Sequence, residues 1–231
     1  MLDIKIDGVS TSSIAGVQLV NSGENVSSVK RFNTNTVYGM NGTSRELEAY
    51  DEKERTLQFH CQSFSDVTNL ISLFDGQDKK IEFWYIKGSF YYYDFVEAKY
   101  SPVTMLSWDV EINISVKPFR YVKDVPDLVM TKSGVLKNIG TIYSEPKIIV
   151  EGSGAVSLTI GSQVMRLQLD TKATIECRHG FQNIYDKNGN LKNSIRQSGS
   201  FFEIPAGQSV GVVLGNGITK VTISPRWRYK V

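Results

Sequence analysis

Apolar and polar residues alternate most regularly between Trp108 and Lys117. Every second position is apolar (Trp108, Val110, Ile112, Ile114 and Val116), and the positions between are polar (Asp109, Glu111, Asn113, Ser115 and Lys117). A period of two places the two sets on opposite faces of a β-strand. The stretch therefore predicts a strand of an antiparallel sheet that is buried on one face and wet on the other. Pro118 lacks a backbone N–H and is expected to end the strand.

A single segment has helical periodicity. Four apolar residues recur there at i, i+3, i+4 and i+7: Val67, Leu70, Ile71 and Phe74. This spacing forms one apolar stripe along a helix. Ser63 with Asp66 makes a weak capping box before it, and Gly76 suits the position just after its end. We expect one amphipathic helix whose apolar face lies on a sheet.

Strand patterns surround this helix. Residues 4–6, 14–20 and 55–61 each predict a strand. Residues 79–101 predict an aromatic hairpin that turns at Lys87-Gly88 and carries aromatic side chains on both faces. Such two-sided apolarity requires cover on both faces, from the domain core, from another subunit or from a stacked ligand.

Two stretches before the helix are polar. Fifteen of the 24 residues from 21 to 44 are Asn, Ser, Thr or Gly, which predicts a long loop or a loose hairpin. Phe32, Val37, Tyr38 and Met40 lie inside it, so either it orders against a partner or these residues pack back on their own domain. Residues 45–55 mix charges and are expected to form a solvated rim.

The second half reads as a series of short strands separated by turns, the pattern of a β-sandwich. Residues 122–146, with two prolines and two glycines, are expected to link the halves, and residues 189–200 predict a second long polar loop. The predicted strands are 147–150, 155–160, 163–169, 173–177, 181–185, 201–204, 209–214, 218–223 and the last residues.

Composition and charge narrow the class of protein. The chain has 231 residues, of which 41% are apolar and 22% charged, as in an ordinary folded protein. No apolar run is long enough to span a membrane, and the N-terminus lacks the features of a Sec signal. Residues 1–120 carry a net charge of −4 and residues 121–231 a net charge of +6. This asymmetry indicates two units with different roles, without the dense basic stripe of a nucleic-acid-binding protein.

Catalytic and metal-binding motifs are not visible. Cys61 and Cys177 lie far apart, each in a strand pattern, and are expected to be buried, reduced thiols made in a cytoplasm. His60 and His179 stand alone, and no catalytic triad, P-loop or dinucleotide fingerprint accompanies them. A glycosidase needs only two carboxylates, but nothing in the sequence nominates a pair. We expect no enzyme activity, no cofactor and no metal site.

The order of elements resembles a known family. The chain opens with a strand that ends in Asp-Gly. A polar loop, a strand and one helix follow. An aromatic hairpin and a strand that closes in Lys-Pro-Phe-Arg-Tyr at 117–121 come last. This order is similar to the N-terminal domain of the distal tail protein (Dit) of long-tailed siphophages. The second half is similar to that family's C-terminal domain through short landmarks: Asn138-Ile139-Gly140-Thr141, Glu145-Pro146-Lys147-Ile148, Gly152-Ser153-Gly154, Asp186-Lys187-Asn188-Gly189, residues 204–209 and residues 223–228.

The resemblance implies a fold and a role. The chain would be mainly β, with a split β-barrel-like domain bearing one α-helix at 1–125 and a galectin-like β-sandwich at 126–231. Six copies would form a ring at the distal end of a non-contractile tail of a phage, or of a tail-derived bacteriocin. The ring would join the tail tube protein to the tail-tip or tail-lysin protein. It would anchor receptor-binding proteins, meet the tape measure protein and pass DNA without specific binding. The protein would reside in the virion, outside any membrane.

The residues themselves suggest where such a ring would close. We expect subunit or partner contacts at Phe32, Tyr38, Met40, Tyr91 and Tyr93, with the acidic first half lining the channel and the basic second half facing outward. The alternative function is a carbohydrate-binding module that recognises a host cell-wall glycan. Its stacking platforms would come from four aromatic residues: Trp84, Tyr91, Tyr93 and Trp227.

Overall fold

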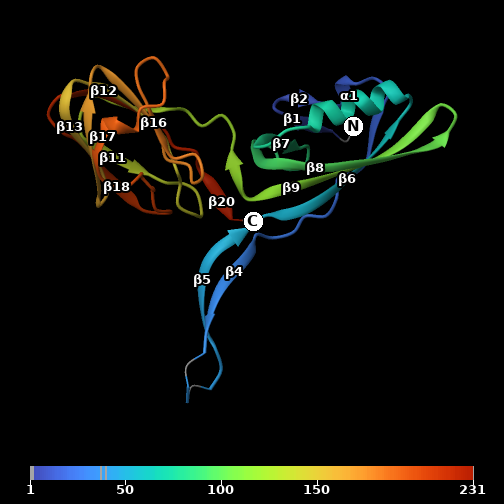
Figure 1. Cartoon of the computed structure of the whole chain (residues 1–231), viewed down its shortest axis with the longest axis horizontal. Helices are drawn as coiled ribbons and strands as arrows, with labels where there is room; N and C mark the ends of the chain where they lie inside the picture. Colours follow the sequence, from blue (N-terminus) through green and yellow to red (C-terminus); the bar gives the residue numbers. More distant parts are fainter. Residues whose placement is uncertain (1–2, 37, 40, 231) are drawn as a thin grey trace. The chain divides into compact units, whose positions relative to one another are not determined.

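The computed structural model describes residues 3–36, 38–39 and 41–230, and the chain divides into two compact units (Figure 1). Unit 1 runs to Tyr121 and also includes Lys230, whereas unit 2 spans Val122–Tyr229. The prediction of a mainly β protein with one α-helix is confirmed for the described residues. Val122 and Val125 pack against the core of unit 2.

An antiparallel sheet forms the body of unit 1. Its strands run in the order β2-β1-β7-β8-β9-β6-β3 and do not close into a barrel within the described residues. Their bounds are β1 Ile4–Ile6, β2 Val9–Ser10, β3 Val17–Asn21, β6 Lys53–Cys61, β7 Lys79–Phe83, β8 Ser89–Thr104 and β9 Ser107–Val122. A short 3-10 helix, η1 Thr11–Ser13, follows β2.

Helix α1, Phe64–Phe74, covers one face of this sheet. Ser63 caps it by accepting a hydrogen bond from the Asp66 N–H at 3.2 Å, as the capping pattern predicts. Leu70 and Phe74 are fully buried, and the Phe74 ring lies 5.6 Å from that of Phe59 on β6. The sequence therefore placed the helix and its apolar face correctly.

Strand β9 shows the predicted alternation but not the predicted end. Val110, Ile112, Ile114 and Val116 are all buried on the helix side of the sheet. The strand continues past Pro118 to Val122. Its neighbour β6 begins at Lys53, opposite Val116, so no β6 residue pairs with β9 at Pro118. A proline that lacks a ladder partner on that side does not break the strand.

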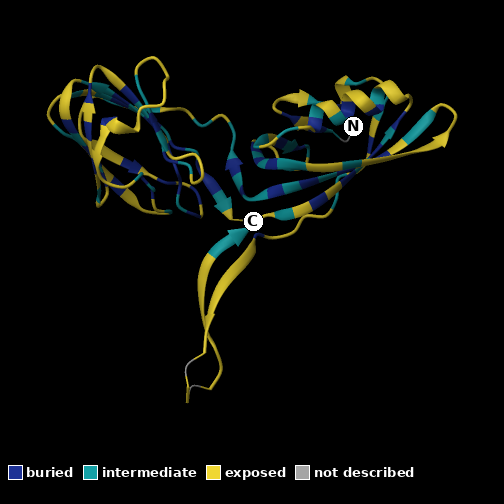
Figure 2. Cartoon of the chain, in the orientation of Figure 1, coloured by how far each residue is buried: buried dark blue, intermediate teal, exposed yellow. Residues whose placement is uncertain are grey.

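Unit 1 also carries a separate two-stranded ribbon, which we call the arm (residues 29–51). It consists of β4 Val29–Asn35 and β5 Ser44–Asp51, paired antiparallel. Most of its described residues are exposed, except at the root of β5, where Ala49, Tyr50 and Asp51 are half-buried (Figure 2). The loose hairpin predicted within 21–44 therefore contains only the first strand of the ribbon, β4, because the second strand, β5, begins at Ser44. Most of the charged residues within 45–55 are exposed, as the predicted solvated rim requires, but they lie on β5 and the start of β6, strands that were not predicted before Arg55.

Unit 2 is a sandwich of two five-stranded antiparallel sheets, the galectin-like architecture that was predicted. One sheet has the order β10-β19-β12-β15-β16 and the other β11-β18-β13-β14-β17. The bounds are β10 Leu128–Met130, β11 Gly134–Lys137, β12 Lys147–Gly152, β13 Gly154–Ile160, β14 Gln163–Leu169, β15 Lys172–Glu176, β16 Asn183–Tyr185, β17 Arg196–Ser198, β18 Ser209–Leu214 and β19 Ile218–Ser224. A last strand, β20 Arg228–Lys230, ends the described chain.

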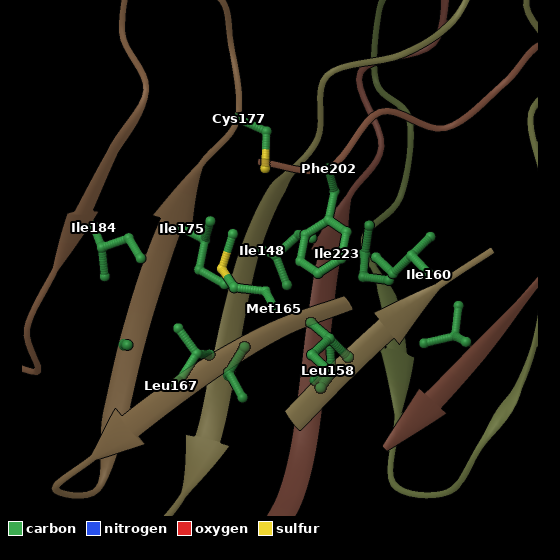
Figure 3. Close-up of a cluster of buried hydrophobic side chains, with 14 of the residues drawn as sticks. Ile148, Leu158, Ile160, Met165, Leu167, Ile175, Cys177, Ile184, Phe202 and Ile223 are labelled. Atoms are coloured by element: carbon green, nitrogen blue, oxygen red, sulfur yellow. The ribbon is translucent and has the colours of Figure 1, made fainter. Parts of the chain in front are cut away.

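The core of the sandwich lies between these two sheets. Leu158 and Met165 from one sheet meet Ile148, Ile175 and Ile223 from the other, and all are buried (Figure 3). Their alternation with exposed residues is the pattern from which the strands were predicted.

Three predictions for unit 2 are wrong. Residues 122–146 are not a bare linker, because they contain β10 and β11. Residues 189–200 are not all loop, because they contain the 3-10 helix η2, Asn193–Ile195, and the short strand β17. Residues 201–204 do not form a strand: Phe202 fills the core, and Ile204 makes an isolated bridge to Ser144.

Candidate interaction surfaces

The arm has two chemically different faces. Lys30 lies opposite Tyr50, Phe32 opposite Leu47, and Thr34 opposite Arg45. Paired residues share a face, and a β-bulge that leaves Glu48 without a partner keeps Tyr50 on the same face as Leu47. These six side chains therefore form one face, which we call the arm face. It combines apolar residues with two cations and no carboxylate. On the opposite face, Arg31 makes ion pairs with Glu48 at 3.4 Å and Asp51 at 3.1 Å.

Several apolar residues of the arm are exposed, although Tyr50 at its root packs against Phe119, with ring centroids 5.3 Å apart. Phe32 and Leu47 each keep 43% of their surface exposed, and Tyr38 is fully exposed. Of the candidate interface residues, Phe32 and Tyr38 are therefore accessible, whereas Met40 and the neighbouring Val37 lie outside the described residues. Leu47 and Tyr50 were missed because the many charges of 45–55 concealed a strand. Their placement opposite Phe32 and Lys30 could not be read without the register.

A hydrogen-bonded clamp holds the root of the arm. The buried Arg55 guanidinium donates to the carbonyls of Ser22 (2.6 Å) and Gly23 (3.2 Å), to Asn25 Oδ1 (3.1 Å) and to the Tyr85 hydroxyl (2.6 Å). The Tyr85 hydroxyl also donates to Asn25 Oδ1 at 2.8 Å.

Further contacts fix the rest of the arm root. Lys53 Nζ donates to the Val26 carbonyl at 2.5 Å, and Ser28 Oγ donates to the Pro118 carbonyl at 2.5 Å. Burial, followed by repulsion from Arg55, lowers the pKa of Lys53. Residues 22–28, which lead into β4, are thus fastened to the body of unit 1.

The sheet face opposite the helix is polar and acidic. Cross-strand pairs cover it: Thr56 Oγ1 donates to Asn113 Oδ1 at 2.6 Å, and Gln58 Nε2 donates to Glu111 Oε1 at 3.2 Å. We call this the acidic face. On β6, β8 and β9 and in the link before β6, which is the part meant by the acidic face from here on, the charged members are Glu52, Glu54, Asp94, Glu97, Asp109, Glu111, Lys99 and Lys117, with His60 hydrogen-bonded to Asp109 at 2.8 Å.

Lys117 is the main internal counterion of this face. Its ammonium group lies 2.5 Å from Glu52 Oε1 and 2.6 Å from Asp94 Oδ2. Partial burial works against its charge, but the hydrogen bonds to Asp94 and Glu52 outweigh burial and raise the pKa of Lys117. Six carboxylates against two lysines leave the acidic face negative.

The aromatic hairpin of β7 and β8 serves the core. Tyr91 and Tyr93 are buried, and the Tyr93 hydroxyl donates to the Phe74 carbonyl at 2.9 Å. Burial raises the pKa of both phenols. Their prediction as interface residues is wrong, because alternation along β8 turns them inward and leaves Phe90 and Tyr92 half-buried on the other face.

Burial also removes most of the predicted sugar-stacking platforms. Tyr91, Tyr93 and Trp227 are all buried, and Trp84 is only partly exposed. A ring that is covered on both faces cannot stack on a sugar.

The turn between β8 and β9 is a second exposed apolar feature. Met105 is fully exposed and Leu106 nearly so. Below the turn, the rings of Phe64, Tyr100 and Trp108 contact one another at centroid distances of 5.3–6.2 Å. The hairpin of β8 and β9 therefore exposes two aliphatic side chains at its turn, next to a cluster of three aromatic rings that contact one another.

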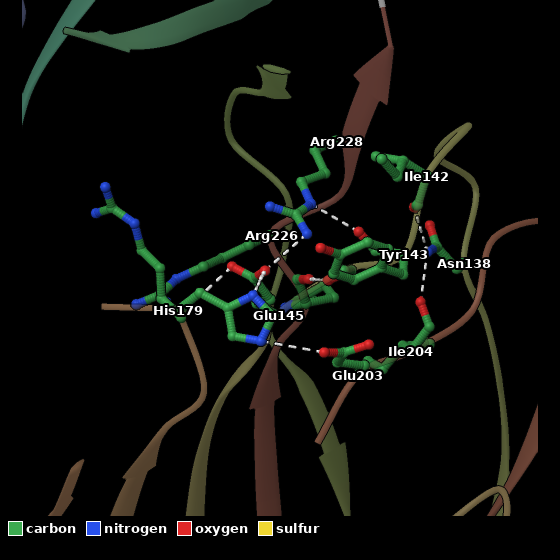
Figure 4. Close-up of polar contacts among 12 residues, drawn as sticks. Asn138, Ile142, Tyr143, Glu145, His179, Glu203, Ile204, Arg226 and Arg228 are labelled. Carbon is green, nitrogen blue, oxygen red and sulfur yellow. Dashed lines mark hydrogen bonds and ion pairs between the residues drawn. The ribbon is translucent and has the colours of Figure 1, made fainter. Parts of the chain in front are cut away.

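A polar network lies at one end of the sandwich in unit 2 (Figure 4). The buried Glu145 carboxylate accepts from Arg228 Nη2 at 2.8 Å and lies 3.1 Å from His179 Nδ1. His179 Nε2 lies 3.1 Å from Glu203 Oε1. The buried Asn138 amide donates to the carbonyls of Ile142 and Ile204. These contacts join separate chain segments and satisfy buried polar groups, which is a structural role.

The remaining candidates for chemistry are also engaged in structure. Burial raises the pKa of the Cys61 thiol to about 11 and that of the Cys177 thiol to about 12. The described part of the chain holds no cluster of three or more metal-ligating side chains. Across residues 3–36, 38–39 and 41–230, no helix is long and apolar enough to cross a membrane.

Comparisons with known proteins give matches in structure and none in sequence. No protein-family model and no curated protein match the chain. Among solved structures, it is similar to the Dit protein of phage SPP1, described as a hub of the adsorption apparatus in phages that infect Gram-positive bacteria. The TM-score is 0.69 at 15% identity, covering 100% of this chain and 99% of that one.

Two structures of the phage P2 baseplate in its activated conformation, with Ca and with Sr, also match. Their TM-scores are 0.58 and 0.55 at 8% identity, over 100% and 96% of this chain and over 99% and 97% of the baseplate chains. The predicted resemblance is confirmed at the level of the fold: over its whole length, this chain has the fold of the siphophage Dit hub protein.

Proposed function

We propose that this chain is the structural hub at the distal end of a long non-contractile tail, in a phage or a tail-derived bacteriocin. Six copies form a ring that joins the tail tube to the tail-tip or tail-lysin protein and anchors receptor-binding proteins. The observation that carries this proposal is the similarity of both units together to one hub protein. Fold similarity alone does not transfer function, so the surfaces must support the role as well.

The arm supplies the contact that a ring needs. An isolated two-stranded ribbon is marginal in water, so an exposed arm of this length gains stability by docking. Ring closure requires one surface to meet a different surface on the next copy. The arm face offers Phe32 and Leu47 to an apolar patch and Lys30 and Arg45 to carboxylates around it. We assign it to the neighbouring subunit.

The acidic face suits the wall of the channel. A negative surface repels DNA phosphates, so the genome passes without sticking. Unit 2, with 13 basic and 8 acidic residues, then faces outward, where it is available to tail-fibre or receptor-binding proteins. The exposed Met105 and Leu106 give unit 1 a further contact for an adjoining tail component.

The ring is tested by removing the arm. A variant in which residues 29–51 are replaced by a Gly-Ser link should remain folded, because Val29 and Asp51 are paired and the gap is short. Light scattering and negative-stain imaging should show rings for the full chain and monomers for this variant. Rings that survive the deletion would place the assembly surface elsewhere.

A matched pair of double substitutions separates docking from folding. F32S/L47S removes the apolar part of the arm face, whereas N33S/E46S alters the opposite face at adjacent paired positions. We expect the first to prevent ring formation and the second to retain it. Equal loss in both would contradict docking through the arm face.

A further inference from the structure

A depression in unit 2 is lined by lysines. It has a volume of about 460 Å³ and lies where the turn after β14, the turn after β16 and helix η2 come together. Its charged lining residues are Asp170, Lys172, Asp186, Lys187 and Lys192. We call it the lysine pocket. Its volume is in the range of sites that hold small ligands.

The two aspartates leave positive charge available. Asp170 is paired with Lys187 at 2.7 Å, and the hydrogen bond from Lys187 lowers the pKa of Asp170. Asp186 instead accepts from the backbone N–H groups of Asn190 and Asn188, both at 2.9 Å. These two hydrogen bonds lower the pKa of Asp186, and the bond from Asn190 has the larger effect. Both bonds end on Oδ1, so this oxygen is occupied within the turn.

Lys172 and Lys192 remain as free donors. Within the residues that the structure describes, neither ammonium group makes a hydrogen bond or ion pair to a carboxylate, although the charge of Lys192 contributes to the lowered pKa of Asp170 and of Asp186; both lysines are exposed. Three lysines against two aspartates give the lining a net charge of +1. An anionic group bound between Lys172 and Lys192 would gain charge-assisted hydrogen bonds.

The rest of the lining favours hydroxyl groups. Ser194 and Gln197 supply hydroxyl and amide groups, and the second oxygen of Asp170 can accept from a ligand hydroxyl. None of the described lining residues is aromatic, so a neutral sugar would find no stacking surface. A nucleic acid fits poorly, because the described lining offers no aromatic side chain on which a base could stack and no basic stripe to follow a longer phosphate backbone.

We propose that the lysine pocket binds a glycan that bears phosphodiester groups. Its phosphate lies between Lys172 and Lys192, and its hydroxyls contact Asp170, Ser194 and Gln197. The site would give the basic unit its own contact with an anionic surface polymer. Glycan binding at this pocket does not require a ring, so its test is independent of the test of the proposed hub function.

The test titrates the full chain with a short glycerol phosphate oligomer in low salt, by calorimetry or by NMR shift mapping. We expect binding that weakens about tenfold in K172Q, about tenfold in K192Q, and steeply as salt rises. The control is K147Q, which removes an exposed lysine of β12 outside the pocket. Circular dichroism of each variant shows that the fold is retained.

Three results obtained with the control variant and the control ligands would overturn the proposal. They are equal weakening in K147Q, equally tight binding of a neutral glucose oligomer, and equally tight binding of a single-stranded DNA oligonucleotide. Inorganic phosphate is included as a separate probe. If phosphate alone accounts for all the binding of the oligomer, the hydroxyl contacts are absent and the glycan assignment is wrong. No binding of the oligomer at millimolar concentration has the same consequence.

Discussion

Arg55 is a buried cation whose four hydrogen-bond acceptors are all neutral. Its guanidinium also lies 4.0 Å from the centre of the Phe83 ring. R55M keeps much of the stem but leaves the carbonyls of Ser22 and Gly23 without a donor. We expect a loss of about 2–4 kcal/mol in unfolding free energy and faster amide exchange in residues 22–28. R31M, on the exposed arm, should cost less than about 0.5 kcal/mol. Unchanged exchange in R55M would show that Arg55 does not hold the arm root.

The two cysteines give a prediction that depends on pH. Burial raises the pKa of Cys61 to about 11 and that of Cys177 to about 12, so both remain thiols at pH 8. A thiol reagent should therefore label neither residue in the native protein and both after denaturation. The unfolded thiols ionise near pH 9, so their contribution to stability is present below pH 9 and lost as pH rises toward 11. Rapid native labelling at pH 8 would contradict this.

At the scale of elements, the sequence predicted the helix and the strands that have one clearly buried face, and it missed the elements without such a face. The alternation in β9 and the stripe on α1 each have one buried face, so periodicity located both. β10, β11 and β17 are edge strands of three or four residues with few buried side chains, too short to show a clear period of two. The aromatic hairpin is apolar on both faces, so its sequence could not show that Tyr91 and Tyr93 point inward. The acidic face and the lysine pocket depend on register and on folded turns, which one sequence does not contain.

Leu70 tests the packing of the helix on the sheet. It is fully buried between α1 and the sheet of unit 1. L70A should lower the unfolding free energy by about 2–5 kcal/mol, because it removes a buried side chain and leaves a cavity. S72A, on the exposed side of the same helix, should change stability by less than about 0.5 kcal/mol. Denaturant melts measure both. A loss below about 0.5 kcal/mol for L70A would mean that this face is not packed.

For the whole molecule, the division into units predicts where proteases cut. Residues 123–127 carry no strand or helix and lie between β9 and β10. Limited proteolysis should cleave there and yield two resistant fragments, because β10 and β11 are tied into the sheets of unit 2. First cleavage within 128–137, or a single core resistant throughout, would contradict two independently folding units.

The charge of the acidic face offers a test of the channel. D109K/E111K changes two exposed carboxylates of β9 and raises the net charge of the chain by four. D127K/E151K makes the same change in unit 2, at residues paired with Ser224 and Lys220. If the acidic face lines the channel, rings of the first variant should retain double-stranded DNA at low salt and release it as salt rises. The second should behave like the original protein, because its new lysines lie outside the channel. Equal DNA retention by both variants would show that net charge alone matters, and the acidic face would lose its assignment to the channel wall.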